Sequence, residues 1–88
     1  MKVPTRPSQD DPKRVKVWEK RRRAVGERIW QFRQENAMTL TELSLRSGVS
    51  RNILADVEDG RRGLLYERLG DIAKALNVPM SELLADID

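Results

Sequence analysis

The chain has 88 residues, of which 39% are apolar, 5% aromatic and 35% charged, and its formal net charge is +3. This length fits one small domain and excludes a two-domain enzyme. The chain contains neither cysteine nor histidine, which excludes disulfides, thiolate nucleophiles and the commonest general base and metal ligand. We therefore expect no catalytic residue, no metal site and no cofactor. No apolar run is long enough for a membrane span or a secretory signal, so we expect a cytoplasmic protein.

The charge is distributed unevenly along the chain. Residues 1–36 carry eleven basic and five acidic side chains, whereas residues 37–88 carry six basic and nine acidic ones. A basic segment beside a compact domain is typical of proteins that bind a polyanion such as nucleic acid. The same pattern also fits a solvated, solubilising tail, and charge alone does not choose between the two.

The amino-terminal third predicts an arm followed by a long helix. Residues 1–11 have almost no apolar side chains, so we expect a flexible arm there. Asp11 and Pro12 have the residue types of a helix N-cap and a first helical position. A helix from residue 12 to about residue 36 is indicated by four apolar residues spaced by seven, four and three, which are Trp18, Val25, Ile29 and Phe32. Gly26 weakens this helix by about 1 kcal/mol relative to alanine.

Two short helices are predicted next, over residues 40–59. Thr39 and Glu42 form a capping box, so a helix is expected to begin at Leu40. Gly48 is a natural stop for it, because glycine adopts the left-handed conformation that closes a helix. Ser50 is expected to cap the next helix, which runs through Asp59 and ends at Gly60.

The carboxyl-terminal part predicts two more helices. After the polar loop at residues 61–63, apolar residues recur on one helical face, namely Leu65, Leu69, Ile72, Ala73 and Leu76. Asn77 and Pro79 are expected to end this helix. A last short helix is expected around residues 81–84. Because no segment alternates with the period of two that strands show, we expect an all-α fold.

The segment at residues 40–59 has the pattern of a helix-turn-helix. Its two short helices surround a glycine-containing turn, and small residues, Ser44 and Ser47, stand where the helices must cross. Four apolar residues have the spacing that buries one face of each helix: Leu43, Val49, Leu54 and Val57. In a helix-turn-helix the second helix enters the major groove of DNA.

In its setting, this segment resembles the Cro and phage-repressor type of DNA-binding domain, the xenobiotic-response-element family. The resemblance covers roughly residues 24–86. It rests on Ile29 to Arg33, Thr39-x-x-Glu42-Leu43-Ser44, Ser47-Gly48-Val49-Ser50 and Glu58-Asp59-Gly60-Arg61. It implies a five-helix bundle of the lambda-repressor-like type over residues 12–88, here with an extended first helix and the basic arm at residues 1–11.

The resemblance also implies which residues contact DNA. Arg51 and Asn52 would read base edges, because arginine pairs with guanine and asparagine with adenine through two hydrogen bonds. Asp56 lies one turn further on and either accepts from cytosine or, as we favour, holds Arg51 or Asn52 in position. Ile53 either packs against a thymine methyl group or completes the core. The residues expected at phosphates are Thr39, Ser50, Arg61 and Arg62.

Arg33 and Glu58 match a pair that in this family links the first helix to the end of the third. We expect them to form a partly buried ion pair that fixes the orientation of the third helix. Removing one partner would leave a buried charge unpaired, at a cost of about 3 to 5 kcal/mol.

Two further sets of residues are candidates for contacts outside the helix-turn-helix. The basic extension before the domain offers DNA contacts at Lys13, Arg14, Lys16 and Arg21, although a charge run is also commonly just solvated. A dimer or partner surface is suggested by apolar residues expected to be exposed, which are Trp18, Trp30, Leu40 and Leu45. Leu40 also replaces a glutamine that binds phosphate in many relatives, so one backbone contact is expected to be missing.

Taken together, the sequence predicts a non-enzymatic, sequence-specific regulator, a repressor, that binds double-stranded DNA as a homodimer at a pseudo-palindromic operator. The organism is expected to be a bacterium or a phage, and no membrane contact is expected. The alternative is an antitoxin or adaptor module that keeps the fold and acts mainly through a protein partner at Trp30, Leu40 and Leu45.

Overall fold

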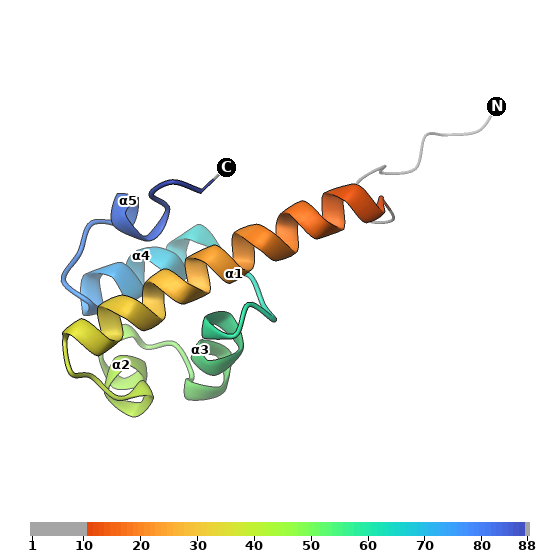
Figure 1. Ribbon diagram of the computed structural model, residues 1–88. Coiled ribbons are helices and arrows are strands. Elements are labelled where there is room, and N and C mark those ends of the chain that lie inside the picture. Colours follow the sequence, from red (N-terminus) through yellow and green to blue (C-terminus); the bar gives the residue numbers. More distant parts are fainter. Residues whose placement is uncertain (1–10, 88) are drawn as a thin grey trace.

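The computed structural model describes residues 11–87, and all regular secondary structure in that range is helical. The helices, in chain order, are α1 (Pro12–Glu35), α2 (Leu40–Ser47), α3 (Arg51–Glu58), α4 (Tyr66–Ala75) and α5 (Met80–Leu83) (Figure 1). The predicted all-α, five-helix architecture is confirmed. Of the predicted arm at residues 1–11, only Asp11 lies within the described residues. Between residues 11 and 87, no helix is both long and apolar enough to cross a membrane.

The long helix α1 begins and ends at the predicted signals. The Asp11 side chain accepts a hydrogen bond from the Lys13 backbone N–H at 3.0 Å, and Pro12 occupies the first helical position. At the other end the Asn36 N–H donates to the Phe32 carbonyl at 3.0 Å, and Ala37 turns the chain with a φ of 49°. With 24 residues, α1 is about 36 Å long at 1.5 Å per residue.

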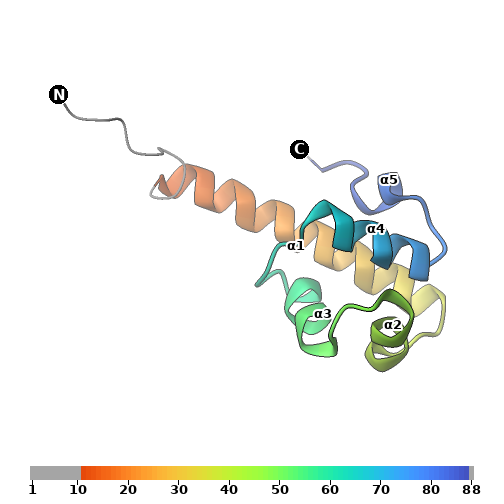
Figure 2. The same ribbon diagram turned by 180° about the vertical axis from the view of Figure 1, so that it is seen from behind.

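The core lies beneath the carboxyl-terminal half of α1. This half of α1 packs on α3 and α5, while α2 packs on both α3 and α4. Viewed from behind, α4 and α5 lie along one side of α1 and the α2–α3 pair lies below it (Figure 2). The buried apolar side chains form one cluster, made of Ile29, Met38, Leu43, Val49, Leu54, Val57, Leu69, Ile72, Ala73, Leu76 and Leu83.

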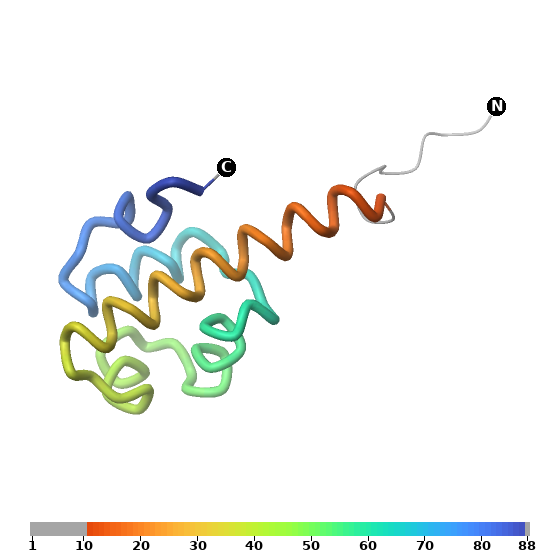
Figure 3. The backbone as a smooth tube through the Cα atoms, viewed as in Figure 1, coloured from red at the N-terminus to blue at the C-terminus, as the bar shows by residue number. Residues whose placement is uncertain are grey.

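The amino-terminal half of α1 projects beyond the other helices (Figure 3). The only residues of α1 that are buried are Gly26 and Ile29, so the turns before Val25 contribute no buried side chain to the core. Val15 and Trp18 continue the apolar stripe of Val25 and Ile29 into the projecting half, where they are only partly covered. The extension is thus helical but independent of the core.

One residue that was predicted to face the core is exposed. Leu65 was placed on the inner face of the fourth helix, but it is the N-cap of α4, with a ψ of 148°, and its exposed fraction is 70%. Because its backbone is extended, it does not follow the helical spacing of Leu69 and Ile72. Leu64 packs against the core in its place.

Candidate nucleic-acid interface

The α2–turn–α3 unit is fixed by local hydrogen bonds at each cap. The Thr39 hydroxyl accepts from the Glu42 N–H at 3.0 Å at the start of α2. Gly48 ends α2 with a φ of 74° and donates its N–H to the Ser44 carbonyl at 2.9 Å. Ser50 then caps α3, because its hydroxyl oxygen accepts from the Ile53 N–H at 3.2 Å. The predicted capping residues therefore occupy their predicted places.

Small residues let α2 and the turn approach each other closely. Ser47 is buried, and its hydroxyl oxygen accepts from the Val49 N–H at 3.2 Å inside the turn. Arg68 of α4 donates to the Gly48 carbonyl at 3.3 Å. Ser47 of α2 and Arg68 of α4 thus both bond the turn, and these bonds help to fix the direction of α3.

The amino end of α3 faces away from the core. Arg51 and Asn52 occupy its first two positions and are exposed, whereas Leu54 and Val57 on the opposite face are buried. Ile53 is partly covered and packs against the core cluster, which supports its core alternative. Asp56 is half-buried, and among the described residues its carboxylate forms no hydrogen bond with Arg51 or Asn52. The role of Asp56 as a support for Arg51 or Asn52 stays a prediction.

The carboxyl end of α3 is pressed against the backbone of α1. Gly26 is buried, and a Cβ added there would overlap the Val57 carbonyl oxygen and lie 2.9 Å from the Glu58 carbonyl oxygen. Gly60 has a φ of 74°, and a Cβ there would lie 3.0 Å from the Cα of Arg23. Gly26 was considered in the sequence only as a residue that weakens the helix. In the structure it is the point at which two backbones touch.

A bidentate ion pair ties α1 to the same end of α3. Arg33 donates through Nε to one carboxylate oxygen of Glu58 at 2.7 Å and through one terminal nitrogen to the other at 2.9 Å. Its other terminal nitrogen donates to the Met38 carbonyl at 2.9 Å. The side chains are 12% and 7% exposed, so the expected partly buried pair is present. The hydrogen bond to Glu58, aided by the Glu58 charge and opposed by burial, raises the pKa of Arg33.

The loop after α3 presents two arginines to solvent. The Arg61 N–H donates to the Asp56 carbonyl at 2.9 Å, which anchors the loop to α3. The Arg61 side chain is 73% exposed and lies 3.9 Å from the Asp59 carboxylate, a separation at which the pair is weak in water. Arg62 is exposed as well. Both side chains are therefore accessible from solvent.

Thr39 is less available than Ser50 for a phosphate contact. Its hydroxyl donates to the Glu42 carboxylate at 3.3 Å, so the proton that a phosphate would accept is already directed to an anion. The Ser50 hydroxyl accepts from Ile53 and keeps its proton for another acceptor. Of the two caps, Ser50 is the better phosphate donor.

The apolar residues proposed as a partner surface do not form one set. Leu45 is 80% exposed and Trp30 is 47% exposed. Leu40, in contrast, packs against the core cluster. Trp18 is partly covered and lies on the projecting half of α1, three turns before Trp30. Two residues that the sequence did not suggest for a partner surface, Leu65 and Tyr66, are 70% and 74% exposed at the start of α4.

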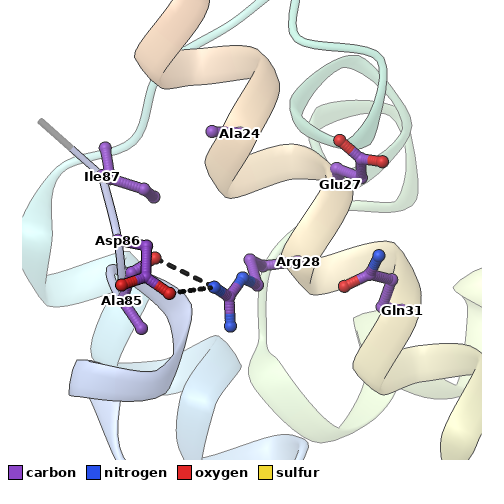
Figure 4. A pocket seen from close by; sticks show the side chains of 7 residues that line it. All are labelled: Ala24, Glu27, Arg28, Gln31, Ala85, Asp86 and Ile87. Atoms are coloured by element: carbon purple, nitrogen blue, oxygen red, sulfur yellow. Dashed lines mark hydrogen bonds and ion pairs between the residues drawn. The ribbon is translucent and has the colours of Figure 1, made fainter.

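Two arginines with clear tertiary roles were not foreseen. Arg28 of α1 donates to the Ala85 carbonyl at 3.0 Å and lies 3.5 Å from the Asp86 carboxylate, as Figure 4 shows. It therefore fastens the chain after α5 to α1. The other is Arg68 at the turn. Nothing in the spacing of the sequence marks either residue, because each contact joins segments 20 or more residues apart.

The chain is similar to known regulators over this region. A family model described as helix-turn-helix matches residues 31–83. An uncharacterized HTH-type transcriptional regulator, y4dJ of Sinorhizobium fredii, is 36% identical over 67 residues, which are 76% of this chain and 87% of that protein. A transcriptional regulator in the ATPase CF(0) region of Rhodospirillum rubrum is 38% identical over 73% of this chain, and the match spans 59% of that protein.

Solved structures show the same similarity. The restriction-modification controller protein C.AhdI of Aeromonas hydrophila has a TM-score of 0.69 and 26% identity, over 70% of this chain and 94% of its own. The clp gene regulator ClgR of Corynebacterium glutamicum has a TM-score of 0.69 and 33% identity, over 73% of this chain and 83% of its own. All four proteins are named as regulators or controllers.

Proposed function

The chain belongs to the helix-turn-helix family of the Cro and phage-repressor type, and from this premise we propose that it is a sequence-specific transcriptional regulator, a repressor, that binds its operator as a homodimer. The observation that carries the proposal is the exposed amino end of α3, where Arg51 and Asn52 project beside the Ser50 cap. Such a helix end fits the major groove, where each base pair presents its own pattern of hydrogen-bond donors, acceptors and methyl groups.

Each residue of the interface has one task in this proposal. Arg51 and Asn52 read base edges, while Asp56 turns toward one of them or toward a cytosine once DNA is bound. Ile53 supports the helix from beneath. Ser50, Arg61 and Arg62 bind phosphates and set the register, as contacts to the backbone do, and Thr39 joins them only if its hydroxyl leaves Glu42. Arg33 and Glu58 hold the orientation of α3.

A symmetric dimer would place two copies of α3 in successive major grooves, about 34 Å apart. This spacing predicts a pseudo-palindrome with half-sites one helical turn apart. No enzymatic step is needed for such a role, and it would be carried out at the DNA, in the cytoplasm of a bacterial cell.

The alternative, an antitoxin or adaptor that acts through a protein partner, is supported by a different observation. Its support is the 80% and 74% exposure of Leu45 on α2 and Tyr66 on α4, because a partner surface needs uncovered apolar side chains. Neither residue is among those proposed to contact DNA, so this role does not exclude DNA binding.

Selection of bound sequences from a random duplex pool tests the proposal. The wild-type protein should enrich one motif with two related half-sites, and its affinity should fall steeply as salt is added. The double variant Arg51→Ala/Asn52→Ala should lose the preference at the bases that these residues read. The matched control Lys74→Ala/Gln31→Ala also removes one basic and one amide side chain, from exposed positions on α4 and α1. It should select the wild-type motif. Enrichment of no motif by the wild-type protein would contradict the proposal.

A further inference from the structure

The projecting half of α1 carries a regular basic stripe. Its members are spaced by three, four and three residues, so they share one face of the helix, and they are Lys13, Lys16, Lys20 and Arg23. All four are exposed. Within residues 11–87 none of them forms an ion pair. Arg14 lies on another face, and Arg21 already has an interaction, so this stripe differs from the four contacts that the sequence suggested.

The stripe ends beside the DNA-binding unit. A Cβ at Gly60 would lie 3.0 Å from the Cα of Arg23, and one at Gly63 would lie 3.5 Å from the Cδ of Arg22. The loop that carries Arg61 and Arg62 therefore packs directly on the carboxyl-terminal end of the stripe. The basic stripe and the loop with Arg61 and Arg62 are therefore neighbours at this point of α1.

The positive charge of the described residues is concentrated in the projecting half of α1. Residues 12–23 carry seven basic side chains and one acidic side chain, whereas residues 24–87 carry eight basic and ten acidic ones. The body of the domain, taken alone, has a net negative charge and would be repelled by DNA at long range. The attraction needed for a polyanion thus comes mainly from the projecting helix.

The same charges decide against the simplest alternative occupant. Two copies of this helix packed through the stripe would bring like charges together, which costs free energy. The extension is also unnecessary for the core, because no residue of α1 before Gly26 is buried. A long, exposed, unpaired basic stripe is suited to a ligand with a regular row of negative charges.

We propose that the stripe Lys13–Lys16–Lys20–Arg23 is a second DNA contact, which binds the phosphate backbone of the duplex flanking the site read by α3. This proposal rests on the proposed function and extends it. Ten residues of helix span about 15 Å, which corresponds to about four or five base pairs at 3.4 Å each. The protein would thus cover more DNA than its helix-turn-helix alone, and the added contact would not depend on base sequence.

The test is the salt dependence of operator binding by the full chain. In the variant Lys13→Gln/Lys16→Gln/Lys20→Gln, each lost phosphate contact should reduce the slope of log K against log salt by about 0.9. Between 50 and 200 mM salt, the variant should then lose about 40-fold less affinity per bound chain than the wild type. Glutamine has nearly the helix propensity of lysine, so α1 should remain helical by circular dichroism.

Matched single variants and trimmed duplexes complete the design. Lys16→Gln and Lys74→Gln each remove one exposed lysine from a helix and leave the same net charge, but only Lys16→Gln should lower the slope. Trimming about five base pairs from each flank should weaken the wild-type complex much more than that of the triple variant, which keeps only Arg23 of the stripe. The motif selected from a random pool should be the same for both proteins.

The outcomes separate the two proposals. A wild-type protein that selects a motif, together with a triple variant of unchanged salt slope, overturns the stripe as a DNA contact and leaves the proposed function intact. The same conclusion follows if the triple variant loses only self-association in sedimentation, or only capture of an acidic protein. A wild-type protein without any motif or salt dependence overturns the proposed function itself.

Discussion

The two ends of α3 lie in opposite surroundings although the helix has only eight residues. At the amino end, Arg51 and Asn52 are exposed, and the described hydrogen bond there is the local cap between Ser50 and Ile53. At the carboxyl end, the backbone touches Gly26 of α1, and Glu58 is held by Arg33. At the end that would meet DNA, the side chains of Arg51 and Asn52 are uncovered, whereas the carboxyl end is fixed to α1 through its backbone and through Glu58.

This difference shows how a domain with a small core can keep exposed side chains at one end of a helix in a fixed orientation. A side chain can reach base edges only if it is uncovered, so the amino end cannot gain stability by burial. Its orientation must come from the far end, where a close backbone contact and a bidentate ion pair leave little freedom. Substitutions at the two ends should therefore change different measurements.

The largest effect on stability is expected from Glu58→Ala. The variant leaves Arg33, whose side chain is 12% exposed, without its carboxylate partner, and the free energy of unfolding should fall by about 3 to 5 kcal/mol. Urea denaturation measures this change. Glu35→Ala, which removes an exposed glutamate from the last turn of α1, should change stability by less than about 0.5 kcal/mol. Equal effects of the two variants would mean that the ion pair does not clamp α3.

A somewhat smaller loss is expected from Gly26→Ala. The new methyl group would overlap the carbonyl oxygens of Val57 and Glu58. Because these are backbone atoms of a helix and cannot change rotamer, α1 and α3 must move apart. We expect a loss of about 3 kcal/mol in thermal or urea unfolding, the upper end of the usual overpacking cost, despite the better helix propensity of alanine.

Gly70→Ala is the matched control for that variant, because Gly70 is also helical and its Cβ would meet only the Met80 sulfur at 3.3 Å. A flexible side chain can move, so this variant should keep or raise stability by up to about 1 kcal/mol. If both glycine variants change the free energy of unfolding alike, the close contact of α1 with α3 is not what fixes the orientation of α3.

A modest effect is expected at the amino-terminal cap. Ser50→Ala removes the acceptor of the Ile53 N–H, and loss of an N-cap costs about 1 kcal/mol. Ser81→Ala, at an exposed position in α5 without a described side-chain hydrogen bond, should cost less than that. Denaturation curves of the two variants compare them, and a cost above about 3 kcal/mol for Ser50→Ala would indicate a tertiary role that the structure does not show.

The smallest effect on stability is expected from the exposed arginines. Arg51→Ala and Arg61→Ala should each change the free energy of unfolding by less than about 0.5 kcal/mol. In DNA binding they should differ: Arg51→Ala should relax the preference at one base position, at about 1 to 3 kcal/mol, while Arg61→Ala should weaken all sequences alike and lower the salt slope by about 1. A uniform loss from Arg51→Ala would show that another surface reads the bases.

The elements of this fold could be predicted because their signals are local. Asp11, Thr39 and Ser50 cap helices through bonds to residues two or three positions away, and Gly48 and Gly60 close helices with positive φ values. Patterns at this range are visible in one dimension. The same holds for the exposure of Arg51 and Asn52, because the apolar spacing of Leu54 and Val57 already shows which face of this short helix is buried.

What the sequence determined by itself was the order of the five helices, the helix-turn-helix within them and the charge of the leading segment, because each depends on neighbours within about one helical turn. Only the tertiary structure decided that Gly26 is a contact point, that Leu40 packs inward while Leu65 is exposed, and that Arg28 fastens the last residues. Such outcomes depend on contacts between segments that are 20 to 60 residues apart in the sequence. A periodic pattern predicts which face of a helix a side chain occupies, but it does not predict which other segment packs against that face.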